Sequence, residues 1–482
     1  MHEQSLMINR RGWAVIMAVM FSILLLTSAE AEETPEWLEL TVTPAAEPRP
    51  ALQYRFVHRR NERRHGNAVP MYARAMIHLG STVDWEETGP RVRDWQNLPL
   101  EELPVDEVRK VLGHHQVFLD EASLYDHAEW ETAAQEHGIS ALLPELGQMR
   151  NLARLVSLRT RIHILEGDYE SAIRSLRTGF TMATHVAEEP IVINHLVGIS
   201  ITAMLTETAY ELIASPNSPN LYWALAQVKA EHIDTRPAIE FESYLMYWSF
   251  PALRDLSTVP MSLEQADRLW EEIFTSPMAA DFGGVMWEHP LPAMGIGITV
   301  YAEAKARLIE LGHDVKAVET MSVKQTLLLH WLIEFEHWVD EMIKWHSLPY
   351  ADAWEGQQRS QQAFERHQAR MSAATNPFLM SLPHFDAARA TEERSRRRLA
   401  LLRCVEAIRM HAAANNGQLP ESLDDITIVP APADPSNNMP FRYELQPDGR
   451  TFTLQPAETD NRRMAVRFKE DRLRVTVEPQ DQ

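Results

Sequence analysis

The middle of the chain carries the spacing of apolar residues that is typical of amphipathic helices. Between residues 67 and 371, apolar side chains recur every three or four positions, glycine is scarce, and prolines gather at segment starts. Such spacing places the apolar side chains on one face of a helix. It predicts helices that begin near 105 and near 169, and further helices near 149–165, 191–213, 220–230, 262–274, 298–311, 315–346 and 350–371, with a loop-rich interruption at 275–294.

Two shorter regions have a different pattern. Residues 38–43 alternate apolar and polar side chains with period two, as a half-buried strand does, and Pro44, Pro48 and Pro50 follow. Near the other end, a long helix is predicted from Asp386 to Ala414, with a left-handed stop at Asn415-Asn416-Gly417. Four alternating runs come next and predict a small antiparallel sheet packed on that helix: 441–445, 451–454, 464–468 and 473–477.

The first residues have the order of parts of a secretory signal. Arg10 and Arg11 precede an uncharged apolar run from Trp13 to Leu26, and Ala29-Glu30-Ala31 offers small residues where a signal peptidase cleaves. The apolar run is shorter than the roughly 18 to 20 residues of a usual membrane-spanning helix. We therefore predict a cleaved signal and an exported, periplasmic or envelope protein. The alternative is an inner-membrane anchor retained through residues 13–28.

These patterns define the predicted fold class: mainly α, an irregular array of helical hairpins with a small C-terminal α+β unit. The boundaries are a signal peptide at 1–31, an extended segment at 32–66, a helical domain at 67–380, and a helix with an antiparallel sheet at 386–482. A chain of 482 residues is expected to form two to four structural units.

Charge and cysteine content narrow the function classes. The formal net charge is −22, and it remains −22 after removal of the predicted signal because Glu3 and Glu30 balance Arg10 and Arg11. A surface this acidic disfavours sequence-independent binding to nucleic acid and docking on anionic lipid. Cys404 is the only cysteine, so no disulfide forms within the chain. Its apolar neighbours predict a small buried side chain, with a bridge between two chains as the alternative.

The central hairpin resembles a tetratricopeptide-type (TPR-like) helix pair. The resemblance rests on Gly167-Asp168-Tyr169, Ala172 and Leu176, and it covers about forty residues. Gly179 stands where an alanine is usual, no proline closes the unit, and no copies recur at a fixed period. The resemblance implies a helical-hairpin geometry only.

A longer resemblance is to a family of uncharacterised secreted proteins of planctomycete bacteria. It covers roughly the first half of the mature chain and implies a class of exported protein without a function. The phrases that carry it are 50–55 (Pro-Ala-Leu-Gln-Tyr-Arg), 66–72 (Gly-Asn-Ala-Val-Pro-Met-Tyr), 165–169 (Leu-Glu-Gly-Asp-Tyr) and 219–225 (Pro-Asn-Leu-Tyr-Trp-Ala-Leu).

The tail is similar to the globular part of type II secretion pseudopilins. The shared order is a helix, the phrase 417–423 (Gly-Gln-Leu-Pro-Glu-Ser-Leu), Asp434-Pro435, and then 440–443. A pilin joins this helix directly to its N-terminal apolar segment, whereas hundreds of residues intervene here. Neither filament assembly nor the calcium loop of the major pseudopilin is therefore carried over.

Three Glu-x-x-His pairs could place a carboxylate and an imidazole on one helix face, as di-iron bundles require. They are Glu62/His65, Glu310/His313 and Glu334/His337. With 20 histidines in the chain, chance alone gives roughly two such pairs. We assign no metal or cofactor site to them.

Three further features have a structural and a functional interpretation. Trp331, Trp338 and Trp345 recur every seven residues and predict a packed aromatic seam, or alternatively a carbohydrate-stacking or partner-binding stripe. His114-His115 predicts a helix-end or surface location rather than a metal pair, because adjacent helical side chains diverge by about 100°. The basic run 394–398 predicts a solvated helix face, or alternatively a contact for an acidic partner.

The sequence contains none of the common catalytic signatures, such as Gly-x-Ser-x-Gly, a phosphate loop or His-Glu-x-x-His. We therefore expect an exported, non-enzymatic scaffold or protein-interaction module of the bacterial cell envelope, and we assign no catalytic residues. One alternative is an envelope hydrolase built from scattered carboxylates and histidines. Another is an accessory of a secretion system that acts through the tail.

Overall fold

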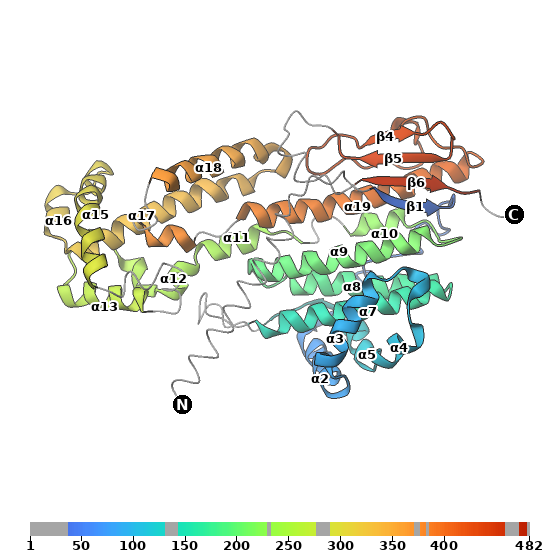
Figure 1. Ribbon diagram of the computed structural model, residues 1–482, viewed down its shortest axis with the longest axis horizontal. Coiled ribbons are helices and arrows are strands. Elements are labelled where there is room, and N and C mark those ends of the chain that lie inside the picture. The colour runs from blue at the N-terminus through green and yellow to red at the C-terminus, as the bar shows by residue number, and fades with distance from the viewer. Residues whose placement is uncertain are drawn as a thin grey trace.

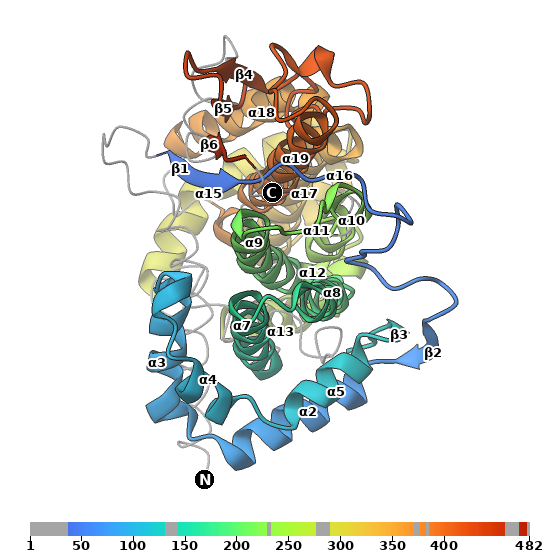
Figure 2. The ribbon, with the colours of Figure 1, turned by 90° about the vertical axis from the view of Figure 1, so that its right-hand side faces the viewer.

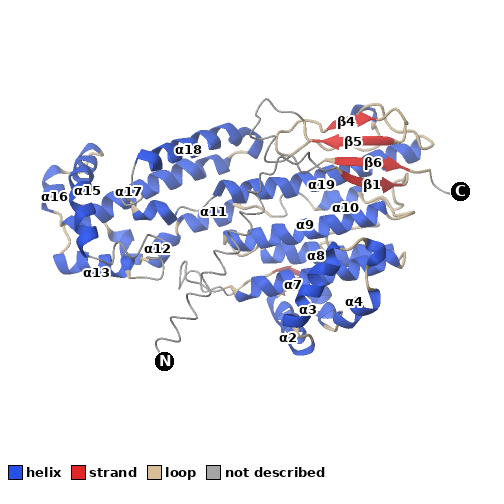
Figure 3. Ribbon diagram, viewed as in Figure 1, coloured by secondary structure: helices blue, strands red, loops and turns tan. Residues whose placement is uncertain are grey.

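The computed structural model describes residues 37–130, 143–228, 233–275, 290–370, 376–381, 385–457 and 472–479. The predicted signal peptide, the alternative anchor at 13–28 and the predicted strand at 464–468 lie outside the described residues. Within them the fold is mainly α, as the sequence pattern predicts, with a small sheet near the C-terminus (Figure 3).

The molecule is elongated, and one long helix, α19 (Phe385–Ala414), runs along its middle (Figure 1). Seen end-on in Figure 2, the layers follow one another from the sheet through α19 to α9, then to α7 and α8, and finally to the N-terminal helices. We call residues 233–381 the distal lobe and the other described residues, α19 apart, the proximal lobe. The distal lobe lies at the left of Figure 1 and the proximal lobe at the right.

The proximal lobe is built on three consecutive helices that pack against each other, α7 (Pro144–Leu165), α8 (Tyr169–Val186) and α9 (Val192–Ala214). Asp168 caps α8 by accepting a hydrogen bond from the backbone N–H of Ser171 at 3.0 Å. Gly179 departs from the usual alanine for a steric reason, because a Cβ there would lie 2.6 Å from Leu205 Cδ1 on α9. The glycine therefore allows α8 and α9 to approach closely.

Shorter elements cover the outer face of this hairpin array. Two parallel strands, β2 and β3, join the helices at one end. The elements are β2 (Arg64–Asn67), α2 (Val69–Thr82), α3 (Trp85–Asn97), η1 (Leu100–Glu102), α4 (Val105–Val111), α5 (His115–Ala122) and β3 (Tyr125–His127).

Helix α9 is long and apolar enough, by length and composition alone, to cross a membrane, and it is the one such helix among the described residues. It packs inside the protein against α7, α8 and α19. The two carboxylates that the sequence places on it have partners, since Glu211 pairs with Arg161 at 2.8 Å and Glu207 with Arg398 at 3.6 Å.

The distal lobe contains the second half of the predicted helices. They are α11 (Arg236–Ser243), α12 (Leu245–Ser249), η4 (Pro251–Asp255), α13 (Leu263–Phe274), α15 (Pro290–Glu310), α16 (Val315–Thr320), α17 (Val323–Ile343), η6 (Lys344–Ser347), α18 (Tyr350–Arg370) and η7 (Pro377–Ser381). The preceding short helix, α10 (Tyr222–Gln227), packs on α19 and belongs to the proximal lobe.

Two boundaries in the distal lobe differ from the prediction. The single helix predicted at 315–346 is divided, because Ser322 caps a new helix by accepting from the N–H of Gln325 at 3.2 Å. Helix α15 begins at Pro290 rather than near 298, within the predicted loop. Proline in a first helical turn lacks only an N–H that has no partner there, so it starts a helix as readily as it ends one.

The sheet has four described strands in the order β1-β6-β5-β4. The predicted antiparallel arrangement is correct for β4 (Arg442–Leu445), β5 (Thr451–Gln455) and β6 (Leu473–Val477). The fourth described strand is β1 (Leu38–Val42), which pairs in parallel with β6 and aligns Leu38 with Leu473. The early segment that the sequence pattern separates from the C-terminal unit therefore contributes a strand to its sheet.

Candidate functional site

The tryptophan repeat on α17 forms a packed seam, which confirms the structural interpretation. Trp331 is fully buried, with its ring 5.7 Å from that of Trp270. Trp338 lies 5.1 Å from the ring of Phe364 on α18. The third member, Trp345, follows α17 in η6 and donates from Nε1 to Ser360 Oγ at 2.8 Å. The seam joins α17 to its neighbours and leaves no tryptophan stripe open for a ligand.

The Glu-x-x-His pairs do not assemble into a metal site among the described residues, where no group of three suitable ligands occurs. The members of each pair have separate surroundings. His65 binds Asp126 at 2.6 Å, and Glu310 binds Arg307 at 2.6 Å. Glu334 binds His367 at 2.8 Å. His337 lies against Trp338, with ring centres 5.3 Å apart.

The adjacent histidines lie at the start of α5, which confirms the predicted helix-end location. The surface location is wrong for His115, which is fully buried. Burial, reinforced by nearby His78 and Arg159, lowers the pKa of His115 to about 4. The side chain is therefore neutral at physiological pH. The predicted burial of Cys404 is confirmed, and burial raises the pKa of its thiol to about 12.

The solvated face predicted for the basic run 394–398 is wrong. Arg397 is 2 % exposed, and the acidic residues just before the run, Glu392 and Glu393, are 4 % and 2 % exposed. These side chains are buried because α19 runs through the middle of the molecule, with the sheet on one side and α9 on the other, as Figures 1 and 2 show. Charges in such a position need partners, because an unpaired buried charge is very costly.

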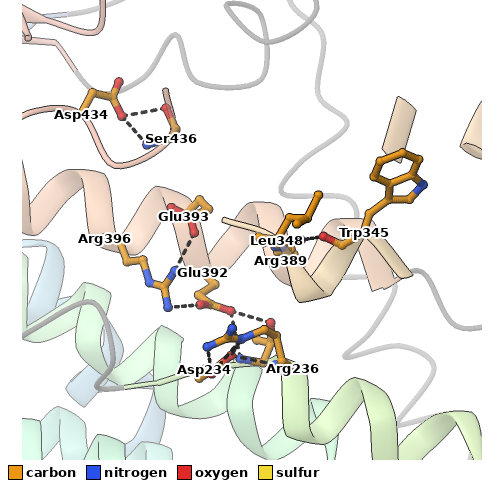
Figure 4. Close-up of polar contacts among 11 residues, drawn as sticks. Asp234, Arg236, Trp345, Leu348, Arg389, Glu392, Glu393, Arg396, Asp434 and Ser436 are labelled. Carbon is orange, nitrogen blue, oxygen red and sulfur yellow. Dashed lines mark hydrogen bonds and ion pairs between the residues drawn. The ribbon is translucent and has the colours of Figure 1, made fainter. Parts of the chain in front are cut away.

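The acidic pair shares one arginine. Arg396 pairs with Glu392 and also with Glu393, the latter at 2.6 Å (Figure 4). Glu392 in addition accepts from the backbone N–H of Thr235 at 2.9 Å, at the residue that precedes α11. Burial raises the pKa of both carboxyls, that of Glu393 to about 7.

Two further arginines of α19 hold other segments. Arg389 donates to the carbonyl oxygens of Trp345, at 2.9 Å, and of Leu348, which closes the C-terminal end of η6 (Figure 4). Arg397 pairs with Asp434 at 3.0 Å, and the carboxylate of Asp434 accepts from the Ser436 hydroxyl at 2.7 Å. We call Arg389, Glu392, Glu393, Arg396 and Arg397 the α19 network.

A serine, a histidine and a glutamate lie in a row in space where the residue after α5 meets the N-terminal segment. Ser123 Oγ is 3.0 Å from His58 Nε2, and His58 Nδ1 is 3.8 Å from Glu62. Ser123 is 2 % exposed, and its hydroxyl donates to the carbonyl of Asp120 at 2.7 Å. The serine proton therefore points to the backbone and not to the imidazole, and substrate has no access to the oxygen. This geometry does not meet the requirements of a nucleophilic triad.

One cavity that could take a ligand is an open groove in the distal lobe, with a volume of about 710 Å³. On one side lie α11, α12, η4 and the residues that follow η4, and on the other lies α17. Buried leucines form its floor: Leu253, Leu256, Leu329 and Leu332. We call it the distal groove. Its volume is that of a typical small-ligand or peptide side-chain site.

Aromatic and ionisable side chains form the walls of the distal groove. The aromatic residues are Phe241, Tyr244, Tyr247 and Trp248. The ionisable residues are Arg254, His313 and Glu336, and Tyr247 donates its hydroxyl hydrogen bond to Glu336 Oε1. Burial, with the nearby Glu336 carboxylate second, raises the pKa of Tyr247 well above its ordinary value. The tyrosine therefore remains a hydrogen-bond donor at physiological pH.

The α19 network supports both walls of the distal groove. Glu392 fixes the start of α11, which carries Phe241, while Arg389 fixes η6 at the end of α17, which carries Glu336. The groove is thus attached to the central helix through two contacts with charged side chains.

Neither a family model, nor a curated protein, nor a solved structure matches this chain. The resemblances to planctomycete secreted proteins, to the tetratricopeptide-type hairpin and to pseudopilins remain predictions.

The sequence analysis did not identify the distal groove. A signal was present, because five of the ten residues from Phe241 to Phe250 are aromatic. Short helices joined by turns bring these residues to one surface, and no single helical period describes such a set.

Proposed function

We propose that this chain is an exported, non-enzymatic interaction module of the bacterial cell envelope, which holds a segment of a partner protein in the distal groove. The observation that carries the proposal is an open, aromatic-walled groove of about 710 Å³, attached to the central helix by the α19 network. Exposed aromatic side chains around an apolar floor are the usual composition of a binding hot spot.

Two further features support this assignment. The leader pattern at residues 10–31 supports export, and it lies outside the described residues. The burial of α19 supports a rigid body instead of a filament subunit. Its first residue, Phe385, is 1 % exposed, so this end of the helix is packed inside the protein and not continued into an apolar stem.

The hydrolase alternative has one point in its favour, because His313 and Glu336 both line the distal groove. Glu336 already accepts the Tyr247 hydroxyl, and its side chain is exposed at the rim. A carboxylate in that position suits ligand contact.

The test places a photo-crosslinking amino acid at Tyr244, whose side chain is 56 % exposed at the groove rim. The matched control places the same group at Ile77, which is 72 % exposed on α2 in the proximal lobe. With the full chain produced in its own envelope, we expect a discrete crosslinked partner from position 244 that Trp248→Ala removes.

Three outcomes contradict the proposal. The same product from positions 77 and 244 would place the contact outside the groove. An unprocessed chain found soluble inside the cell would exclude export. Hydrolysis of an envelope polymer that His313→Ala and Glu336→Gln both abolish would favour the hydrolase alternative.

A further inference from the structure

Four aromatic residues line one wall of the distal groove, and their rings lie close together in pairs. Tyr244 and Tyr247 have ring centres 6.4 Å apart at an interplanar angle of 41°. Phe241 and Trp248 are nearly parallel, with centres 6.5 Å apart and an angle of 21°. The ring face of an aromatic side chain carries partial negative charge and attracts cations.

One of these faces already holds a cation from the chain itself. The guanidinium carbon of Arg254, from η4, lies 4.8 Å from the centre of the Trp248 ring. Arginine prefers this stacked geometry because its planar group is weakly hydrated. Arg254 is exposed, so it occupies a position that solvent and an incoming group can also reach.

Carboxylates stand on the opposite wall. Glu336 of α17 lines the groove and accepts the Tyr247 hydroxyl, and the charge of Asp340, one turn further along α17, also acts on Tyr247. A guanidinium on the aromatic wall would therefore face acceptors on α17. The chain as a whole carries a formal charge of −22, which attracts a basic partner before contact.

We propose that the distal groove receives an arginine side chain from a basic segment of a partner protein, stacked on Trp248 and Tyr244 and facing the carboxylate of Glu336. The proposal rests on the proposed function and specifies the partner's chemistry. In the free protein Arg254 stands in for the incoming guanidinium, and it swings out when the partner binds.

The same groove could instead bind an acidic segment through Arg254. The surroundings disfavour that occupant, because Arg254 is already stacked on Trp248 and is followed directly by the exposed Asp255. An anion in the groove would also face the like charge of Glu336 on α17. The two occupants predict opposite effects of Arg254→Gln. A basic partner should then bind more tightly, whereas an acidic partner should bind more weakly.

The experiment measures fluorescence anisotropy of labelled peptides with the purified protein. The peptides are identical and neutral except for a central Leu-Arg-Leu, Leu-Gln-Leu or Leu-Glu-Leu. We expect the arginine peptide to bind about tenfold more tightly than the glutamine peptide. Trp248→Ala and Glu336→Gln should each weaken its binding about three- to thirtyfold, since each removes one contact to the guanidinium.

The decisive variant is Arg254→Gln, which removes the internal competitor and one positive charge. We expect the arginine peptide to bind about threefold or more tightly to it than to the unaltered protein. The matched control is Arg359→Ala, another exposed arginine stacked on a tryptophan, 5.9 Å from the Trp345 ring and outside the groove. It should leave binding unchanged. An unchanged thermal melt for each variant establishes that the fold is intact.

Three results would overturn the inference. Preference for the glutamate peptide, lost in Arg254→Gln, would assign an acidic partner. Equal binding of free arginine and the arginine peptide would assign a small-molecule cation site. Equal binding of all three peptides would leave an apolar groove, and the proposed function would then still stand if the crosslink at position 244 persisted. Loss of that crosslink would remove the proposed function as well.

Discussion

The two lobes are attached to the same helix in different ways. The proximal lobe packs on the C-terminal half of α19, where apolar side chains such as Leu402, Val405 and Ile408 are fully buried. The distal lobe is attached to the N-terminal half, where the α19 network supplies carboxylates and guanidinium groups to the ends of α11 and η6. Both attachments are buried, but apolar packing responds to changes of side-chain volume, whereas charged contacts also respond to changes of pH.

This difference separates a rigid support from a binding lobe. Close apolar packing is insensitive to pH and tolerates little change of volume. An attachment through charged groups depends on their protonation and on complete pairing. Both attachments contain buried ion pairs, but the attachment of the distal lobe includes Glu393, whose carboxyl pKa is raised to about 7. The geometry of the distal groove should therefore be the part of the molecule that a change of pH near neutrality alters most easily.

The largest expected effect is in the proximal attachment, at an ion pair whose two side chains are both fully buried. Arg409 pairs with Glu406 at 2.7 Å, and it also donates to the carbonyl oxygens of Thr43 and Ser218. Arg409→Met leaves the buried Glu406 carboxylate without its cation, with only the Leu221 N–H as a donor, and leaves two carbonyls without the Arg409 donor. We expect a loss of about 3–5 kcal/mol in the free energy of unfolding, measured in urea.

The control for that variant is Arg442→Ala. Arg442 pairs with Glu444 on the exposed surface of β4, so its loss should cost less than about 1 kcal/mol. Equal effects of the two substitutions would show that the buried pair does not hold the proximal lobe to α19.

The second prediction concerns pH and distinguishes the two attachments. The pKa of Glu393 is about 7 in the folded protein, raised from 4.5 mainly by burial, with Glu392 raising it further and Arg396 and Arg389 opposing. A raised carboxyl pKa means that the folded state binds the proton more tightly. The stabilisation is complete below pH 4.5 and is lost as the pH rises through 7. The rise of the Glu393 pKa from 4.5 to about 7 corresponds to about 3 kcal/mol in the free energy of unfolding.

Glu393→Gln should therefore stabilise the protein relative to the unaltered chain more at pH 8 than at pH 4.5. His115 in the proximal lobe should behave in the opposite way. Its pKa is lowered to about 4, so its contribution is present above pH 6.5 and is lost as the pH falls towards 4. His115→Phe should remove that acid sensitivity. Urea unfolding across pH 4.5–8 measures both, and parallel pH profiles for the two variants would contradict the comparison.

The smallest expected effects come from glycines at helix contacts. A Cβ at Gly198 would lie 2.6 Å from the carbonyl oxygen of Ala183, part of a backbone that cannot swing away. A Cβ at Gly356 in the distal lobe would lie 2.2 Å from the Trp345 ring, a partly exposed side chain that can turn aside. We expect Gly198→Ala to cost about 1–3 kcal/mol and Gly356→Ala to cost less, measured by thermal unfolding.

A third glycine gives the baseline. Gly147 in α7 is exposed, with nothing within 4 Å of a Cβ built there. Gly147→Ala should stabilise the protein by about 0.5–1 kcal/mol through helix propensity alone. A greater loss at Gly356 than at Gly198 would mean that the distal lobe is the more rigid of the two.

The sequence predicts the local elements well wherever a single periodicity applies. The start of α8 at Tyr169, the span of α13 and the end of α19 at Ala414, before Gly417 with φ +84°, follow from caps and apolar spacing. The errors occur where a local signal has two meanings. Pro290 and Pro292 begin a helix although proline-rich segments usually indicate loops, and Ser322 interrupts a continuous apolar pattern with a cap.

Long-range relationships could not be predicted from the pattern. The residues Glu392, Glu393 and Arg396 have the composition of a surface helix, yet Glu392 and Glu393 are buried by tertiary packing, and Glu392 accepts a hydrogen bond at the start of α11. The distal groove likewise depends on α17 lying opposite residues that are distant in the chain. Both features arise from tertiary packing, which local periodicity does not record.

The parallel pairing of β1 with β6 determines when the sheet can form during synthesis of the chain. Residues 38–42 emerge from the ribosome hundreds of residues before residues 472–478, whose backbone groups pair with theirs. The early strand must therefore wait, unpaired, until nearly all of the chain has been synthesised. The sheet then closes last over a helical body that has already formed, so a nascent chain remains incomplete and open to translocation or proteolysis until its final strand arrives.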